Sequence, residues 1–210
     1  MFYNFDKRMD HGLNKFHYEL SNDYDGVFNT VQRNHEDKVF TYNTEVDGRS
    51  FSMTLNRKYE DTGRTDVTVL ECAQFTIGEE SGSLLHCIKK GKNIFNNEWY
   101  EELTYGGHTY KCYEVGRGKE GTFYCIYRGE SLVAMIRKDP VSLHCENNYG
   151  CYAYDDVPVA VLLVFNIYFD IHKYYETSRY SNKTLHTWQK WAKSKFDPDF
   201  IETIRTNKTI

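Results

Sequence analysis

Residues 157–175, VPVAVLLVFNIYFDIHKYY, form the stretch that decides the fold of this chain. Its first part, 157–165, carries no polar side chain. The valines also suit a buried strand, because β-branched residues favour sheets. Asp155–Asp156 offers an N-cap, Pro158 suits the first turn of a helix, and the run is too long for one strand. We therefore predict a helix.

The polar residues of this helix fall on one narrow stripe that includes Asn166, Asp170 and Lys173. Apart from His172 the other positions are apolar, so the helix must be buried on nearly every side. We expect Asn166 to be buried and to hydrogen-bond to strand backbone. Asp170 and His172 are candidates for a proton-transfer pair, but we favour a helix that emerges into solvent at that point, because buried charges are rare unless paired.

The chain before this helix has a hydrophobic period of two, and two glycine-containing turns predict hairpins with a defined register. Asp47–Gly48 and Gly106–Gly107 are typical of two-residue hairpin loops. The predicted cross-strand pairs are Val46–Arg49, Thr44–Phe51, Tyr42–Met53 and Phe40–Leu55 in the first hairpin, and Leu103–Tyr110 and Glu102–Lys111 in the second.

A third hairpin is predicted at Gly129–Glu130, and it is apolar on both faces. Its predicted pairs are Phe123–Ile136, Cys125–Ala134 and Tyr127–Leu132. Because both faces are apolar, another element must cover the outside. Two C-terminal helical segments are candidates, one with Leu185, Trp188, Trp191 and Ala192 on one face and one with Phe200, Ile201 and Ile204 facing inward.

Further strands are predicted at 2–5, 15–20, 26–33, 67–75, 83–89, 141–145 and 149–154. A flat sheet covers only one side of a helix, whereas a closed sheet covers every side and removes exposed edges. The predicted fold is mainly β: a closed antiparallel β-barrel of about 10–12 strands that encloses the helix at 157–175. We expect residues 1–180 to form the barrel with its helix, and residues 181–210 to form a helical C-terminal extension packed on it.

The segment 129–173 combines a late hairpin with small and apolar residues, an aromatic strand, an acidic cap and a long apolar helix. The residues of the hairpin and of the aromatic strand are Gly129, Leu132, Ala134, Ile136, Arg137–Lys138, Tyr149, Tyr152 and Tyr154. With these features the segment resembles the end of a tubby C-terminal-like domain, the superfamily of the LURP-one-related proteins and the phospholipid scramblases. The resemblance implies a twelve-stranded barrel around a hydrophobic C-terminal helix, and contact with phosphoinositides or other anionic lipids. The extension from residue 181 departs from the family pattern.

Composition excludes several classes of function. The net charge of −4 gives no electrostatic footprint for nucleic acid. The apolar block is shorter than the roughly 20 residues that span a bilayer, and the N-terminus lacks a signal-peptide pattern, so we expect a cytoplasmic protein that is not transmembrane. The six cysteines form no CxxC pair, and no spacing matches a zinc site. We expect no metal, no cofactor and no catalytic residue.

The leading hypothesis is a non-enzymatic binding or scaffold domain. A first alternative is peripheral binding to anionic lipid or phosphoinositide through surface basic residues, namely Lys89, Lys90, Lys92, Arg137, Lys138, Lys190 and Lys193. A second alternative is a small-molecule or enzyme site at a barrel mouth. The helix that bears Trp188 and Trp191 either packs on the barrel or forms a partner surface, and the sequence leaves this open, together with the ligand and the oligomeric state.

Overall fold

The computed structural model of the chain describes the backbone of residues 1–10, 15–21, 26–31, 34–36, 39–46, 49–56, 64–92, 96–140, 147–170 and 190–206. Side chains are described for residues 1–5, 49–55, 64–92, 96–140, 147–170 and 192–206. The predicted strand at 141–145, His172 and the predicted helical face at Leu185–Trp188 lie outside the described residues.

Strands dominate the described part of the chain, which confirms the prediction of a mainly β protein. The strands are β1 (Phe2–Asp10), β2 (Lys15–Ser21), β3 (Gly26–Val31), β4 (Asn34–Glu36), β5 (Val39–Val46), β6 (Arg49–Asn56), β7 (Thr68–Ile77), β8 (Glu80–Lys89), β9 (Glu98–Tyr105), β10 (His108–Gly116), β11 (Thr122–Arg128), β12 (Ser131–Lys138) and β13 (Asn147–Ala153). The helices are η2 (Gly118–Glu120), α1 (Val159–Phe169), α2 (Lys190–Ser194) and α3 (Phe200–Thr206).

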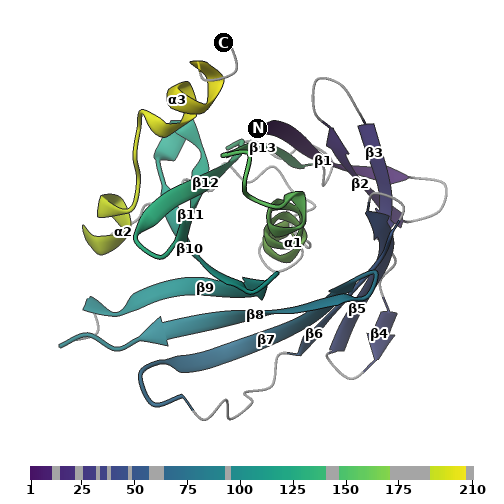
Figure 1. Ribbon diagram of the computed structural model, residues 1–210, viewed down its shortest axis with the longest axis horizontal. Helices are drawn as coiled ribbons and strands as arrows, with labels where there is room; N and C mark the ends of the chain where they lie inside the picture. Colours follow the sequence, from purple (N-terminus) through teal and green to yellow (C-terminus); the bar gives the residue numbers. More distant parts are fainter. Residues whose placement is uncertain are drawn as a thin grey trace.

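The strands form one 13-stranded sheet in the order β3-β2-β1-β13-β12-β11-β10-β9-β8-β7-β6-β5-β4. Strand pairing is antiparallel throughout the described ladders. The first and last long strands of the chain meet, because β1 pairs with β13. The sheet is strongly curved, and Figure 1 shows α1 near the middle of the view with strands on several sides of it.

Helix α1 begins later than the acidic cap predicted. Pro158 is the N-cap residue, and its carbonyl accepts a hydrogen bond from the Val161 amide at 3.0 Å. Asp155 and Asp156 lie in the preceding turn, and the Asp156 carboxylate pairs with the Arg128 guanidinium instead of a helix amide. The prediction of an aspartate N-cap was therefore wrong, because Asp156, the aspartate nearer to the helix, forms an ion pair with Arg128 of β11.

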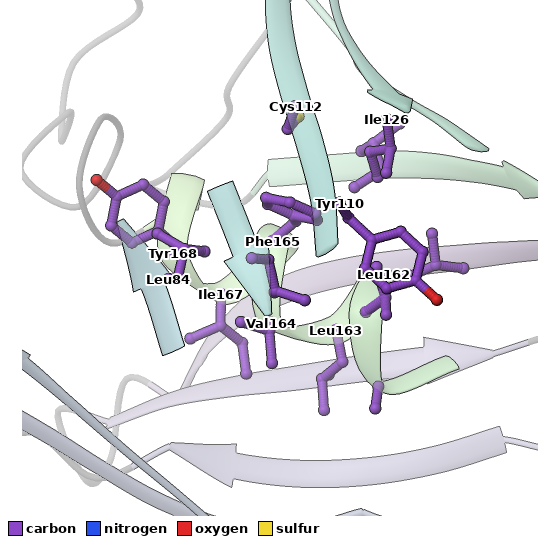
Figure 2. Packing of buried hydrophobic residues seen from close by; sticks show 14 of the residues in the cluster. Leu84, Tyr110, Cys112, Ile126, Leu162, Leu163, Val164, Phe165, Ile167 and Tyr168 are labelled. Carbon is purple, nitrogen blue, oxygen red and sulfur yellow. The ribbon is translucent and has the colours of Figure 1, made fainter. Parts of the chain in front are cut away.

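The side chains of α1 form the centre of the main hydrophobic core. Every residue from Ala160 to Phe169 is buried, as expected for a helix that is buried on nearly every side, and Val161, Leu162, Val164, Phe165 and Phe169 each have 0% exposure. Figure 2 shows how Leu162 and Phe165 lie against Tyr110 of β10. The Phe169 ring stacks on Tyr124 of β11, with centroids 3.9 Å apart. The apolar sequence of the helix is therefore explained by burial all round.

The register of the first two predicted hairpins is confirmed. Val46 lies opposite Arg49 and Phe40 opposite Leu55. Leu103 lies opposite Tyr110 and Glu102 opposite Lys111. On β6 the alternation is also as predicted, since Phe51, Met53 and Leu55 are buried in the core.

The register of the third hairpin was wrong beyond its first pairs. Tyr127 lies opposite Leu132 as predicted, but a β-bulge follows, and Ile126 then lies opposite Ala134 and Tyr124 opposite Ile136. The extra residue on β12 is Val133, which joins its neighbour Ala134 in the inner core. The bulge shifts every later pair by one residue, so the residues of β12 beyond it lie on the opposite face from the one predicted.

A second hydrophobic cluster covers the outer face of this hairpin. It contains residues of β10 to β13 and of the C-terminal segments: Val115, Phe123, Cys125, Met135, Tyr152, Ala192, Phe200 and Ile204. Ile201 and Phe196 pack against the same cluster. For Ala192, Phe200, Ile201 and Ile204 the prediction that C-terminal helical segments cover the outside of the doubly apolar hairpin is confirmed, whereas the side chains of Leu185, Trp188 and Trp191 lie outside the described residues. Figure 1 shows α2 and α3 on the outside of β10 to β12.

Candidate functional site

The basic residues predicted from the sequence fall into separate places. Lys89 ends β8, and Lys90 and Lys92 follow it, and all three side chains are exposed. Lys89 lies opposite Glu98, the first residue of β9. Trp99 follows Glu98 and is 38% exposed. Its ring lies 5.8 Å from that of His86, on the face of the sheet opposite to that of Lys89.

Arg137 and Lys138 do not belong to a common patch. They are consecutive in β12, so their side chains leave opposite faces of the sheet. Arg137 donates from Nε to the Glu120 carbonyl at 3.1 Å. Lys138 is only 4% exposed and faces the same side as Ala134 and Ile136 of the inner core. Lys138 therefore does not extend an exposed basic surface.

The remaining predicted lysines lie on α2. The Lys193 side chain is exposed, whereas the side chains of Lys190 and Trp191 lie outside the described residues. Trp188 precedes the described part of the C-terminal segment. Helix α2 contacts β10.

The end of α1 carries a buried polar cluster that contradicts the expected emergence into solvent. Asp170 has 0% exposure. Its Oδ1 accepts hydrogen bonds from Asn147 Nδ2 at 2.7 Å and from the Tyr149 hydroxyl at 2.8 Å. The Lys138 ammonium lies 5.9 Å from the centre of the Tyr149 ring. The burial of Asp170 is therefore compensated by two hydrogen-bond donors from β13.

A second group of inward-facing polar side chains lies on β7, β8 and β9. Glu71 is opposite His86, and His86 is opposite Glu101. The His86 Nδ1 atom lies 3.2 Å from Glu101 Oε1. The Tyr168 hydroxyl of α1 donates to Glu71 Oε2 at 3.3 Å. These side chains share the inner face because residues two apart point the same way and Ala73, Leu84 and Leu103 are core residues.

Asn166 lies one helical turn before Asp170 and is fully buried, as predicted. Its Nδ2 donates to the Leu162 carbonyl at 2.8 Å and to the Cys151 Sγ at 3.1 Å. The expected partner was strand backbone, so the prediction was right about burial and wrong about the acceptor. The amide satisfies its donors within α1 and on β13.

The inward-facing polar groups are suited to hydrogen bonding and to charge pairing. Among the described residues there is no group of three or more His, Cys, Asp and Glu side chains that could hold a metal ion. Burial raises the pKa of the Cys87 thiol to about 12 and that of the Cys125 thiol to about 12. These thiols are therefore neutral at ordinary pH and poorly suited to nucleophilic catalysis.

The alternation of apolar residues in the sequence could have predicted that two of the inward-facing charged residues, Glu71 and Lys138, lie on a buried face. Glu71 precedes Ala73, Phe75 and Ile77 with a period of two, and Lys138 follows Ala134 and Ile136 in the same way. Both charged residues therefore share the buried face of their strands. The hydrogen bonds to Asp170 had no sequence signal, because they join residues that are remote in the chain.

Comparisons with protein-family models, with curated proteins and with solved structures found no match to this chain. The resemblance to the tubby C-terminal-like superfamily therefore stays a proposal. Within the part of the chain that the structure describes, none of the helices combines the length and apolarity required to cross a membrane.

Proposed function

We propose that the curved sheet closes into a β-barrel around α1, with the architecture of a tubby C-terminal-like domain. Two observations support closure. The Cα atoms of β3 and β5 approach within 8 Å, although these strands stand near opposite ends of the sheet order. The side chains of α1 are buried in every direction, which a closed sheet explains better than an open one.

The function that this architecture supports best is that of a non-enzymatic binding or scaffold domain that uses its outer surface. The observation that carries this proposal is the burial of every α1 side chain from Ala160 to Phe169. The helix occupies the inner space where a barrel would otherwise hold a ligand. The polar cluster around Asp170 is engaged in hydrogen bonds within the chain.

A thermal-shift screen with anionic vesicles and a metabolite panel tests this proposal when it is followed by hydrogen exchange on each hit. We expect added protection on strand amides and on the α2–α3 segment, with no change in the amides of α1. A hit whose added protection is confined to α1 and to the strand residues around Asp170 would instead indicate an internal ligand site, and would contradict the proposal.

Binding to anionic lipid is a second candidate function, favoured by the exposed lysines at the end of β8. Lys89, Lys90 and Lys92 are exposed, and Trp99, at the same end of the sheet, is 38% exposed. Each lysine near an anionic surface contributes about 1 kcal/mol, and tryptophan is enriched at membrane interfaces. Lys193 on α2 is a further exposed candidate.

Co-sedimentation with phosphatidylserine vesicles at low salt tests this second candidate. The variant K90Q should bind more weakly than the wild type, and the triple variant K89Q/K90Q/K92Q should lose binding. The matched control is R49Q, which removes one exposed positive charge near Glu80, at the opposite end of β8. Equal loss in K90Q and R49Q, or no wild-type binding at low salt, would end the lipid hypothesis.

A further inference from the structure

The ammonium group of Lys195 lies in a corner formed by two tyrosine rings on the outer face of the sheet. Its Nζ is 4.8 Å from the centre of the Tyr113 ring and 4.9 Å from the centre of the Tyr127 ring. The two rings meet edge to face, with centroids 5.7 Å apart and planes at 80°. Both distances are within the range in which a ring face attracts a cation.

Neighbouring strands fix the two rings in this arrangement. Tyr113 is on β10 opposite Cys125 of β11, and Tyr127 is two residues further along β11, which is a diagonal neighbour on the same face. Tyr113 is 4% exposed and packs against the Tyr100 ring at 5.8 Å. Tyr113 is therefore held by contacts within the sheet that do not involve Lys195.

Tyr127 also holds the backbone of the same lysine. Its hydroxyl donates to the Lys195 carbonyl at 2.9 Å. Lys195 follows directly after α2, and the next residue, Phe196, packs on Phe123 at 4.9 Å between ring centres. Lys195 thus belongs to a segment that packs on the outer face of the sheet, and its side chain reaches the corner from there.

The electrostatic surroundings of the corner favour a cation. The pKa of Tyr113 is raised chiefly by burial and then by the negative charges of Glu98 and Glu130. The pKa of Tyr127 is raised to about 12 by burial, with Asp197 and Glu130 contributing. Both phenols are therefore neutral at ordinary pH, and carboxylates lie close enough to add to the attraction of the rings.

We propose that the Tyr113–Tyr127 corner is a binding site for alkylammonium groups and that Lys195 is its resident ligand in the free chain. An external alkylammonium group, from a free quaternary ammonium compound or a methylated lysine side chain, then competes with Lys195 for the two rings. The corner lies on the outer face and deepens the proposed outer-surface binding function, on which it rests. Glu98, which acts on Tyr113, lies opposite Lys89, so the test measures binding of an alkylammonium compound and not binding to anionic vesicles.

The experiment is a titration of Lys195→Ala with tetramethylammonium, followed by the proton NMR signal of the added cation. Bound methyl groups over two ring faces shift upfield, and we expect millimolar binding to K195A and at least tenfold weaker binding to the wild type. The matched control is Lys193→Ala, which removes an exposed lysine of α2 two residues before Lys195 and leaves Lys195 in place. The control should behave as the wild type.

A double variant shows whether the rings are responsible. Adding Tyr127→Leu to K195A should abolish the upfield shift while near-ultraviolet circular dichroism shows a retained fold. Choline and an Nε-trimethyl-lysine peptide, compared on K195A, distinguish a free ligand from a side-chain ligand. Absence of binding to folded K195A, or equal binding to K195A and its Y127L derivative, would overturn the proposal.

The wild-type chain provides a test if K195A does not fold. With lysine labelled at the ε-carbon, one ε-methylene signal should be shifted upfield by the rings, and it should return toward the unstructured position as tetramethylammonium is added. Sodium chloride at equal ionic strength should leave it in place. A signal that responds equally to both salts, or to neither, would contradict competition for the corner.

Discussion

Replacing Leu162 with alanine tests the packing of α1 most simply. Leu162 has 0% exposure and lies in the main core. A Leu→Ala change in a rigid core costs about 2–5 kcal/mol, because the transfer free energy is lost and a cavity remains. We expect the upper half of this range, since Leu162 belongs to a core cluster to which many strands contribute buried side chains. The melting temperature should fall by about 7–20 °C for a chain of this size.

Urea unfolding followed by circular dichroism measures this change, provided that the slope of the transition is the same in both proteins. Val159→Ala is the matched control, because Val159 is the first residue of the same helix and is only partly buried. It should cost about 1 kcal/mol or less. A near-neutral effect of L162A, or equal effects of the two variants, would refute a helix that is packed all round.

Three further perturbations follow from the described contacts. Asp170→Ala leaves two buried donors without their acceptor, which should cost about 2–6 kcal/mol in urea unfolding, whereas D170N should cost less because its amide oxygen still accepts. Gly121→Ala should lower the melting temperature more than Gly129→Ala does, because a Cβ at Gly121 (φ +103°) would lie 2.2 Å from the Lys138 carbonyl oxygen, whereas nothing lies within 4 Å at Gly129; equal effects would contradict this contact. Burial raises the pKa of Cys125 to about 12 from the ordinary 9.0, so the thiol ionises at lower pH in the unfolded chain than in the folded one. The contribution of Cys125 to folding stability is therefore present below about pH 9 and is lost toward pH 12. Over this window the unfolding free energy of C125A should decline less steeply than that of the wild type, by up to about 1.4 kcal/mol per pH unit.

The sequence predicted those features that depend on neighbouring residues in the chain, namely turns, strand alternation and the apolar run of α1. The Gly106–Gly107 turn fixes the pairing of β9 with β10, because a two-residue loop leaves one register for the flanking strands. The unbroken apolar run predicted the burial of α1. The apolar outer face of the third hairpin predicted that another element covers it, and α3 does so through Phe200 and Ile204.

The errors arose where a remote contact overrides a local pattern. Asp170 looked like the solvated end of a helix, but Asn147 and Tyr149 of β13 supply its hydrogen bonds. The sequence has no glycine at Val133 that would indicate a bulge there. This bulge shifts the register by one residue, so the pairs beyond Tyr127 differ from those predicted. Arg137 and Lys138 were assigned to one basic surface because they are adjacent in the sequence, but the Lys138 side chain points inward and is buried.

The central claim is that α1 is enclosed by the sheet, and native-state hydrogen exchange of the amides of residues 162–169 tests it most directly. If the helix is enclosed, these amides exchange only when the whole protein unfolds, so their opening free energies equal the global unfolding free energy from urea denaturation. They should match the amides of β10 and β11. Opening free energies several kcal/mol below the global value would show that α1 leaves the sheet independently, and would contradict the account.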